Sequence, residues 1–326
     1  MKAIVQDRYG GPDVLEFSDI DRPVPNDNEV LVQVRAAGLH RGDWHVMTGL
    51  PYLIRLVVPD LGLRKPKIPV RGMDLAGRVE AIGPNVTRFQ PGDEVFGWAD
   101  GAFAEYAAAP QDQLAPKPAN LSFEQAAAVP TSGFAALQGL RDSGEVQPGQ
   151  QVLIIGAAGA VGLFAVQLAK TFGAQVTGVA STSQLELVRS IGADEVIDYT
   201  RQDVTDGTRQ FDLILDCAGR RTLSKLRRAL TPTGTLVIVG GEGGGRLMGG
   251  FFRNLRAPVL SRFVGQRLRM LASKERPQDL QTLRELLETG KVTPVIDRTF
   301  PLREVPEAFR QLVEGRGRGG KLAITI

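Results

Sequence analysis

The sequence predicts an α/β domain with a doubly wound parallel sheet, inserted into a second domain that is rich in β-structure. Three observations predict this. Short alternating segments separated by glycine and proline turns occupy the first third of the 326-residue chain. From residue 151 onward, strand, turn and helix patterns follow one another. Residues 321–326 return to a β-branched strand, so we expect the β-rich domain to hold both ends of the sequence.

The β-rich part is predicted from alternation of apolar and polar residues, which is the period of a half-buried strand. Expected strands are residues 2–6, 30–37, 78–83 and 94–98. Many short strands with such turns suggest a barrel-like module. Near residue 121 the character changes, because Ser122 followed by Glu124 and Gln125 predicts a capped helix start.

The α/β part is predicted from strands that alternate with helices, which indicates a parallel sheet covered on both faces. Expected strands are residues 151–155, 175–180, 195–198, 211–217 and 235–239. Expected helices are residues 161–172, 184–191 and 222–230. Toward the end of the sequence two more helices are expected at residues 277–289 and 305–314. We therefore divide the chain into residues 1–123 and 291–326 for the β-rich domain and 124–290 for the nucleotide-binding domain.

Composition excludes several classes of protein. The 39 Lys and Arg against 36 Asp and Glu leave a net charge of +3 with no long basic run, which argues against nucleic acid as a partner. The single cysteine, Cys217, excludes an internal disulfide framework and a multi-cysteine zinc site, and it favours a reducing, cytoplasmic location. Neither a signal peptide nor a membrane-spanning run is predicted.

The strongest chemical signal is the turn at residues 156–162, Gly-Ala-Ala-Gly-Ala-Val-Gly, between a predicted strand and a predicted helix. Glycines in such a turn permit a sharp bend, close approach of a pyrophosphate and tight helix packing. The helix start offers free N–H groups to the phosphates. The alternative is an ordinary glycine- and alanine-rich turn. The predicted cofactor contacts are Gly156, Ala158, Gly159, Ala160, Val161 and Gly162.

The next strand favours NADPH over NADH as the cofactor. NAD enzymes usually place Asp or Glu at its end, whereas here Ser181 and Thr182 follow and offer hydroxyls to a 2′-phosphate. A basic partner is missing, because position 183 is Ser. Tyr199, Arg189 and Arg201 are nearby in sequence and are the candidates to assist, with plain surface residues as the alternative.

Two further strand ends are predicted to face the cofactor, since open α/β sheets bind ligands at the carboxyl ends of their strands. Residues 217–219 follow one strand and residues 239–241 follow another. Cys217 is interpreted as a small residue near the cofactor, not as a nucleophile. The expected contacts are Ala218, Gly219, Val239, Gly240 and Gly241.

Over essentially its whole length the sequence resembles the medium-chain dehydrogenase/reductase superfamily. The resemblance rests on the glycine turn and on residues 36–39 (Ala-Ala-Gly-Leu), 72–77 (Gly-Met-Asp-Leu-Ala-Gly), 91–95 (Pro-Gly-Asp-Glu-Val), 130–133 (Pro-Thr-Ser-Gly), 192–199 (Gly-Ala-Asp-Glu-Val-Ile-Asp-Tyr) and 320–321 (Gly-Lys). It implies a GroES-like β-barrel domain joined to a Rossmann domain, with an active site in the cleft between them.

Zinc-dependent members of that superfamily hold a catalytic metal with Cys, His and Cys. The matching positions here are His40, Met73 and Ala128, and the companion acid is Asp74. Met73 is a poor zinc ligand and Ala128 is no ligand, so we expect no metal, with a residual His40/Asp74 site as the alternative. The zinc-free branch resembles quinone oxidoreductases, which transfer a hydride from NADPH to quinones or conjugated enones.

The candidate catalytic residues are His40, Asp43, His45 and Thr131. Related quinone reductases often have Asn at position 40 and Tyr at position 45, and the chain has no histidine besides these two. His40 is interpreted as a nicotinamide or substrate contact and His45 as a proton donor or relay. The alternative is that Asp43 caps the following turn and the histidines only pack. Thr131 matches the family position near the nicotinamide.

Two segments are left open: residues 51–69, a lid or a solvated loop, and residues 243–269, a cleft wall, an oligomer contact or an ordinary basic helix. The expected partner is a small electrophilic acceptor, and the expected assembly is a homodimer or a monomer, since many relatives pair through the Rossmann domain. Alternative functions are a zinc-free alcohol/aldehyde or enoyl-thioester reductase and a non-catalytic, NADPH-binding regulatory or crystallin-like protein.

Overall fold

The computed structural model describes residues 1–57, 61–241, 245, 249–315 and 317–326, with only the backbone at 57, 251 and 252. Contacts divide the chain into two units. The first unit comprises Met1–Thr131, Glu275–Gly290 and Pro294–Ile326, and the second comprises Ser132–Lys274 and Lys291–Thr293. Parts of the open segments, residues 58–60, 243–244 and 246–248, lie outside the described residues.

These units divide the chain at other residues than the boundaries expected after 123 and 290. Helix α3 (Phe123–Ala127) packs on strands of the first unit, and helix α10 (Pro277–Glu288) packs beside strand β7 (Leu114–Pro116) of the same unit. The Asn120 side chain donates to the Leu287 carbonyl oxygen at 2.9 Å, which ties α10 to this unit. The change from strand-like to helical sequence therefore does not mark the boundary between the units, because helices α3 and α10 bury their apolar faces against the β-rich unit.

The first unit contains a mixed sheet in the order β14-β15-β3-β4-β5-β7, with β6 paired to β3. A separate antiparallel pair is formed by β1 (Lys2–Val5) and β2 (Glu16–Asp19). The predicted return of the chain to the β-rich unit is confirmed, because the last described strand pairs antiparallel with β3. The bounds are β3 Glu29–Leu39, β4 Asp74–Ile82, β5 Glu94–Trp98, β6 Tyr106–Pro110, β14 Ile296–Pro301 and β15 Lys321–Thr325.

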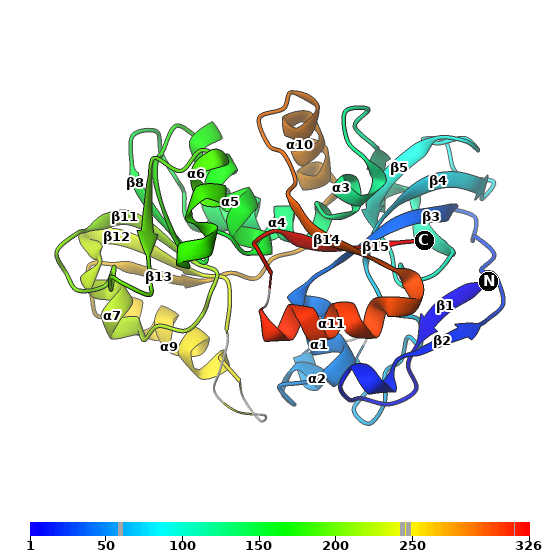
Figure 1. Cartoon of the computed structure of the whole chain (residues 1–326), viewed down its shortest axis with the longest axis horizontal. Helices are drawn as coiled ribbons and strands as arrows, with labels where there is room; N and C mark the ends of the chain where they lie inside the picture. Colours follow the sequence, from blue (N-terminus) through cyan, green and yellow to red (C-terminus); the bar gives the residue numbers. More distant parts are fainter. Residues whose placement is uncertain (58–60, 242–244, 246–248, 316) are drawn as a thin grey trace. The chain divides into compact units, whose positions relative to one another are not determined.

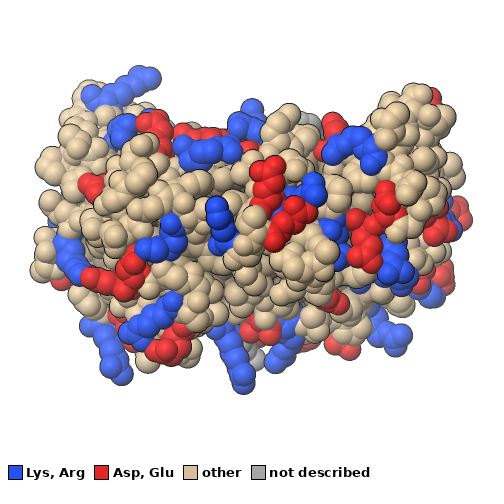
Figure 2. Space-filling model, turned by 90° about the horizontal axis from the view of Figure 1, so that it is seen from above, with Lys and Arg blue, Asp and Glu red and all other residues tan. Residues whose placement is uncertain are grey.

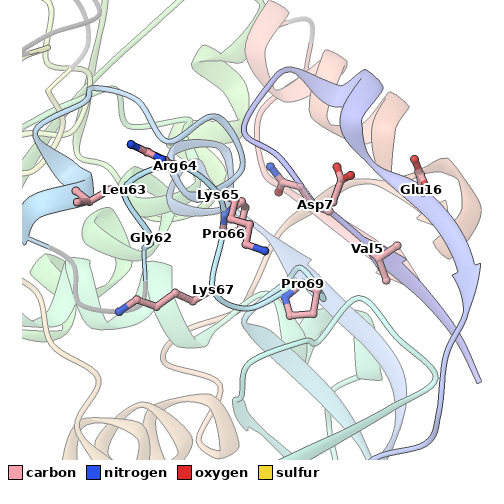
Figure 3. Close-up of a pocket in the computed structure, with 11 residues that line it drawn as sticks. Val5, Asp7, Glu16, Gly62, Leu63, Arg64, Lys65, Pro66, Lys67 and Pro69 are labelled. Carbon is pink, nitrogen blue, oxygen red and sulfur yellow. The ribbon is translucent and has the colours of Figure 1, made fainter.

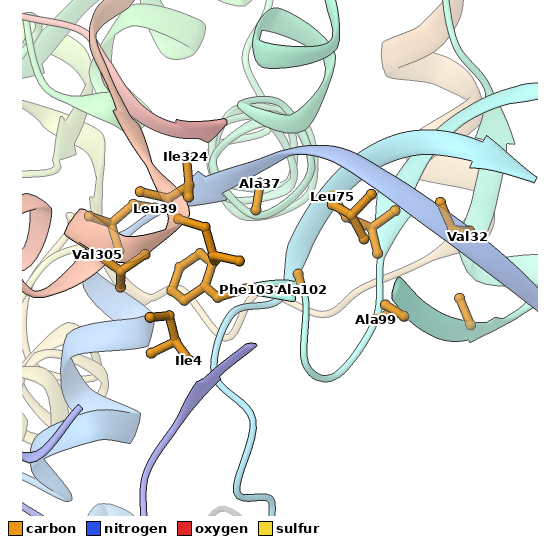
Figure 4. Close-up of a cluster of buried hydrophobic side chains, with 14 of the residues drawn as sticks. Ile4, Val32, Ala37, Leu39, Leu75, Ala99, Ala102, Phe103, Val305 and Ile324 are labelled. Carbon is orange, nitrogen blue, oxygen red and sulfur yellow. The ribbon is translucent and has the colours of Figure 1, made fainter. Parts of the chain in front are cut away.

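The core of this unit joins residues that are far apart in sequence. Figure 4 shows the fully buried Phe103 ring among Ile4, Leu39 and Val305. Val305 begins helix α11 (Val305–Glu314), whose Phe309 ring lies edge-on to Phe103 with centroids 6.3 Å apart. Burying such aromatic side chains is worth a few kcal/mol each, so the last helix and the first strand are held in one core.

The second unit contains a parallel sheet in the order β10-β9-β8-β11-β12-β13 (Figure 1). The order runs outward in both directions from the adjacent strands β8 and β11, so the predicted doubly wound Rossmann arrangement is confirmed. The bounds are β8 Gln151–Ile155, β9 Gln175–Ala180, β10 Glu195–Asp198, β11 Phe211–Asp216, β12 Leu230–Ile238 and β13 Arg267–Met270.

Three helices accompany this sheet at predicted places, namely α5 Ala160–Thr171, α6 Leu185–Ser190 and α7 Leu223–Arg228. Two more were not predicted: α9 Phe251–Ser261, and α4 Pro130–Gln138, which crosses the division between the units. Helix α9 falls inside the open segment 243–269, and strand β13 begins in it and ends at Met270. Strand β13 escaped prediction because it has only four residues, too few for their alternation to stand out.

The surface gives no sign of a single-charge patch on the face in Figure 2, where basic and acidic side chains are interspersed. Among the residues that the structure describes, no helix has the length and apolar character needed to cross a membrane.

Candidate active site

The glycine turn after β8 is built to bring a ligand close to the backbone. Gly156 has φ +81°, a conformation that side chains disfavour. A Cβ at Gly162 would lie 2.1 Å from the Gly156 carbonyl oxygen, so only glycine lets α5 start this close to the strand. No side chain caps α5 at Gly159. The turn therefore fits a pyrophosphate, which would accept from the free N–H groups at the helix start.

The hydroxyls after β9 do not stand alone. Thr182 Oγ1 donates a short hydrogen bond to Asp198 Oδ2, and Thr200 donates to Asp198 Oδ1 through its backbone N–H and its hydroxyl. These hydrogen bonds lower the pKa of the Asp198 carboxyl. The expectation that no carboxylate lies here needs correction. None follows β9 itself, but parallel pairing sets Asp198 of β10 opposite Ala180, the last residue of β9.

The candidate basic partners are already engaged. Arg189 forms an ion pair with Glu186 in the same helix, and Arg201 Nε lies 3.7 Å from Asp198 Oδ2. Tyr199 is exposed, and its N–H donates to the Ala180 carbonyl oxygen at 3.1 Å. Unlike the two arginines, Tyr199 forms no ion pair within the described residues, and it lies beside the end of β9.

Three strand ends meet beside the glycine turn. A Cβ at Gly156 would lie 3.3 Å from Ala218, and a Cβ at Gly240 would lie 2.4 Å from the Cys217 carbonyl oxygen. Gly219 N–H donates to Asp216 Oδ1 at 3.1 Å. Burial raises the pKa of the Cys217 thiol, so it stays protonated and is a weak nucleophile. The predicted cofactor contacts that follow β8, β11 and β12 thus lie together at one edge of the sheet.

The second candidate cluster lies in the first unit, where His40 follows the end of β3. His40 is the N-cap of helix α1 (Arg41–Thr48). Its Nδ1 accepts from the Asp43 N–H at 3.3 Å, and Asp43 Oδ2 accepts from the His40 N–H at 2.9 Å. This reciprocal pair is a capping box, so the interpretation of Asp43 as a cap describes the local structure correctly.

The cap decides which nitrogen of His40 holds the proton. Because Nδ1 accepts a hydrogen bond, a neutral ring carries its hydrogen on Nε2. Nε2 is buried without a hydrogen-bond partner in the described residues and lies 3.4 Å from Asp43 Oδ2. The pKa of the imidazole is lowered to about 4, chiefly by burial; the Asp43 charge opposes this effect and the Lys321 charge adds to it. His40 is therefore a neutral donor near pH 7.

Beside His40 lies a buried ion pair. Lys321 Nζ is 3.6 Å from Asp74 Oδ2, and both side chains are at most 1% exposed. Burial raises the pKa of the Asp74 carboxyl, and the Lys321 charge opposes this effect. The pair exists because β15 and β4 flank β3, with Leu322 opposite Leu39 and Asp74 opposite Gly38.

Thr131 is tied to this pair. Its hydroxyl donates to Asp74 Oδ1 at 2.6 Å, and its N–H points at the same carboxylate at 3.2 Å. The hydroxyl hydrogen is thereby used, so Thr131 has only its lone pairs to offer another group. Thr131 can accept from a carboxamide N–H, but it cannot donate to a substrate oxygen.

The structure separates His45 from the His40 cluster. Its Nδ1 pairs with the Leu50 carbonyl oxygen at 2.7 Å. Sequence reasoning did not single out Arg71. Its side chain is buried, which lowers the pKa of the guanidinium, and the charge of nearby Asp43 opposes this effect. Lys321 had one signal, the closing Gly-Lys motif, while Arg71 had none.

The residues at the zinc positions do not fit a catalytic zinc. Ala128 has no donor atom and Met73 offers only a thioether. Within the described ranges, no three His, Cys, Asp or Glu side chains gather as ligands for one ion.

A cavity of about 750 Å³ lies elsewhere in the first unit, and none of the predicted catalytic residues lines it. Figure 3 shows its wall from the loop at residues 62–69, with Arg64 and Lys65 on one side and Asp7 on the other. The Tyr9 hydroxyl donates to the Gly62 carbonyl oxygen at 2.6 Å and holds this loop. Residues 62–69 of the open segment 51–69 therefore form one wall of this cavity.

Comparison with known proteins decides the family. The family model for the alcohol dehydrogenase GroES-like domain matches residues 26–119, and that for zinc-binding dehydrogenases matches residues 191–324. Human quinone oxidoreductase is 32% identical over all of this chain and 98% of its own length. The chain belongs to the medium-chain dehydrogenase/reductase superfamily.

Further relatives place it among the quinone oxidoreductase-like members of this superfamily. The mitochondrial NAD(P)H oxidoreductase RTN4IP1 of Mus musculus is 33% identical over 98% of this chain and 88% of its own length. The structure of the quinone oxidoreductase from Coxiella burnetii superposes with a TM-score of 0.85 at 30% identity, covering 100% of this chain and 99% of that one. This medium-chain dehydrogenase/reductase is an oxidoreductase of the type that uses a nicotinamide cofactor.

Proposed function

We propose that the protein transfers a hydride from NADPH to quinones or α,β-unsaturated carbonyl compounds without zinc. The observation that supports this best is the buried Nε2 of His40 on a ring that stays neutral: it has no hydrogen-bond partner among the described residues, and Asp43 Oδ2 is 3.4 Å away. Hydride addition to a conjugated carbonyl develops negative charge on its oxygen. A preorganised donor in a dry site stabilises that charge far better than water does.

The cofactor, once bound, supplies the hydride. The chain's own residues bind and orient the cofactor and the acceptor. His40 would donate its Nε2–H to the acceptor oxygen, and Asp43 would hold the ring through the reciprocal cap. Because a neutral imidazole is a weak acid, the proton that completes the reduction would come from water. Thr131 would accept from an amide N–H of the nicotinamide.

The choice of NADPH is supported by the absence of Asp or Glu at residues 181–183 and by exposed Tyr199, and it is opposed by the Asp198 carboxylate. The Ser181 and Thr182 hydroxyls already donate to Gln184 and Asp198. Thr182, Thr200 and Arg201 surround the Asp198 carboxylate, which reduces its repulsion of a 2′-phosphate. On balance the lack of an acidic residue after β9 favours NADPH.

The test is steady-state oxidation of NADPH and NADH with a quinone, an enone, an enoyl thioester and an aldehyde. We expect turnover with the quinone or the enone, unchanged by a zinc chelator. Turnover restricted to the aldehyde or the thioester would favour the alternative reductases. Tight NADPH binding with no acceptor reduced would contradict the assignment as an enzyme.

The role of His40 is tested by replacing it. His40→Ala should lower kcat about a hundredfold, the usual effect of losing one donor to a developing oxyanion. His40→Asn is the matched control, because an Asn side chain both caps the helix and offers an N–H donor. Asn should recover most of the rate. An alanine variant as fast as the wild type would remove His40 from the proposal.

A further inference from the structure

One side chain from α9 joins the two turns that end β11 and β12. Arg253 Nη1 donates to Asp216 Oδ2 at 2.7 Å and to the Arg221 carbonyl oxygen at 2.7 Å. Its Nη2 donates to the Gly240 carbonyl oxygen at 2.9 Å. The acceptors belong to both turns, so the guanidinium spans the gap between them. Arg253 lies in the segment 243–269, whose role the sequence did not decide.

Asp216 links this contact to the predicted cofactor residues. Its side chain is fully buried, and its Oδ1 accepts from the Gly219 N–H at 3.1 Å while its Oδ2 faces Arg253. The Asp216 carbonyl oxygen accepts from the N–H groups of Val239 and Gly240. One carboxylate and one guanidinium therefore set the course of residues 217–219 and 239–241 together.

The start of α9 also rests on the second turn. A Cβ at Gly250, the N-cap of α9, would lie 2.6 Å from Gly241 backbone atoms. The Asn254 amide lies 3.3 Å from the place of a Cβ on Gly241. This close packing sets the helix that carries Arg253 directly against the turn that Arg253 binds.

We propose that Arg253 is a positioning residue for the nicotinamide cofactor: it holds the turns after β11 and β12 at the spacing that cofactor binding requires. This inference rests on the proposed cofactor role of those turns. Their glycines leave the backbone without side chains to hold it in place, so an external clamp sets their separation. Loss of the clamp weakens cofactor binding through the turns, without removing any group that touches the cofactor.

The geometry explains why arginine is needed. A guanidinium offers donors in a fixed planar fork, whereas a lysine ammonium is a single point charge. Arg253→Lys keeps a positive charge for buried Asp216 but cannot reach Asp216, Arg221 and Gly240 at once. This one substitution therefore separates the two roles of Arg253, which are to neutralise the charge of Asp216 and to bridge the turns after β11 and β12.

The experiment measures NADPH and NADH affinity from the change in nicotinamide fluorescence, and thermal unfolding in parallel, for the wild type and three variants. Arg253→Lys should unfold near the wild-type temperature but bind the cofactor about tenfold more weakly, the effect of one lost charge-assisted hydrogen bond. Arg256→Lys is the matched control, since Arg256 is exposed on the same helix. It should match the wild type in both measurements.

The double variant Arg253→Met/Asp216→Asn guards against a folding defect, because it removes both charges while Asn can still accept from the Gly219 N–H. It should fold and should bind the cofactor as weakly as Arg253→Lys or more so. Cofactor affinity within twofold of the wild type in both Arg253→Lys and the double variant would overturn the inference. A wild-type protein that binds neither cofactor would instead overturn the proposed function.

Discussion

The candidate cofactor turn and the candidate catalytic cluster are made of different chemical groups. The cofactor turn of the second unit is made of backbone: glycines at 156 and 162 and a helix start without a side-chain cap. The cluster of the first unit is made of buried charged and polar side chains, His40, Asp43, Asp74 and Lys321. The glycine turn itself contains no charged side chain. The buried cluster does, and each of its charges depends on its partner.

The largest expected effect tests that dependence. Lys321→Met should lower the free energy of unfolding by about 3–5 kcal/mol, because it leaves the buried Asp74 carboxylate without its partner. Urea or guanidinium denaturation measures this. Lys2→Met is the matched control: it removes the exposed pair with Asp19 and should cost less than about 1 kcal/mol. Equal costs for the two would contradict the comparison.

The double variant Lys321→Met/Asp74→Asn sharpens the same point. Removal of both charges should recover most of the lost stability, since an amide at position 74 still accepts from the Thr131 hydroxyl. Failure of the double variant to recover would mean that Lys321 acts through packing and not through its charge.

The next effect depends on pH. The folded-state pKa of His40, about 4, lies below the unfolded value of 6.5, so the unfolded chain binds the proton first as pH falls. Stability contributed by the neutral ring is complete above pH 6.5 and is lost between pH 6.5 and about 4, by at most about 1.4 kcal/mol per pH unit.

His40→Asn should remove this slope. Denaturation of both proteins from pH 7 to pH 4 gives the difference, in which the contributions of Asp43 and Asp74 largely cancel. Parallel curves would show that His40 is not held neutral by burial.

The smallest effect concerns the cofactor half. Asp198→Asn removes the carboxylate beside Thr182, so the preference for NADPH over NADH should rise by a few fold, with little change in stability. The ratio of kcat/KM for the two cofactors measures this. A loss of all cofactor binding would mean that the cofactor site depends on its side chains as strongly as the buried cluster around His40 does.

Local features were predictable from the sequence. The glycine turn needs its residue types for backbone reasons alone, and the His40 and Asp43 pair lies within one helix start. Features made by strand pairing were not. Asp198 reaches Thr182 only because β10 lies beside β9, and Arg253 reaches Gly240 only because α9 folds back on the end of β12.

The sequence by itself determined most strands and helices of the α/β part and the position of the glycine turn, because these follow from local periodicity and from glycine's lack of a side chain. The superfamily followed from motifs that the sequence shares with it. Only the tertiary structure decided the chemistry around His40. The neutral state of that imidazole depends on burial, and its neighbour Lys321 lies 281 positions away along the chain. Pairing of β15 with β3 brings the two together, and that pairing depends on the whole core.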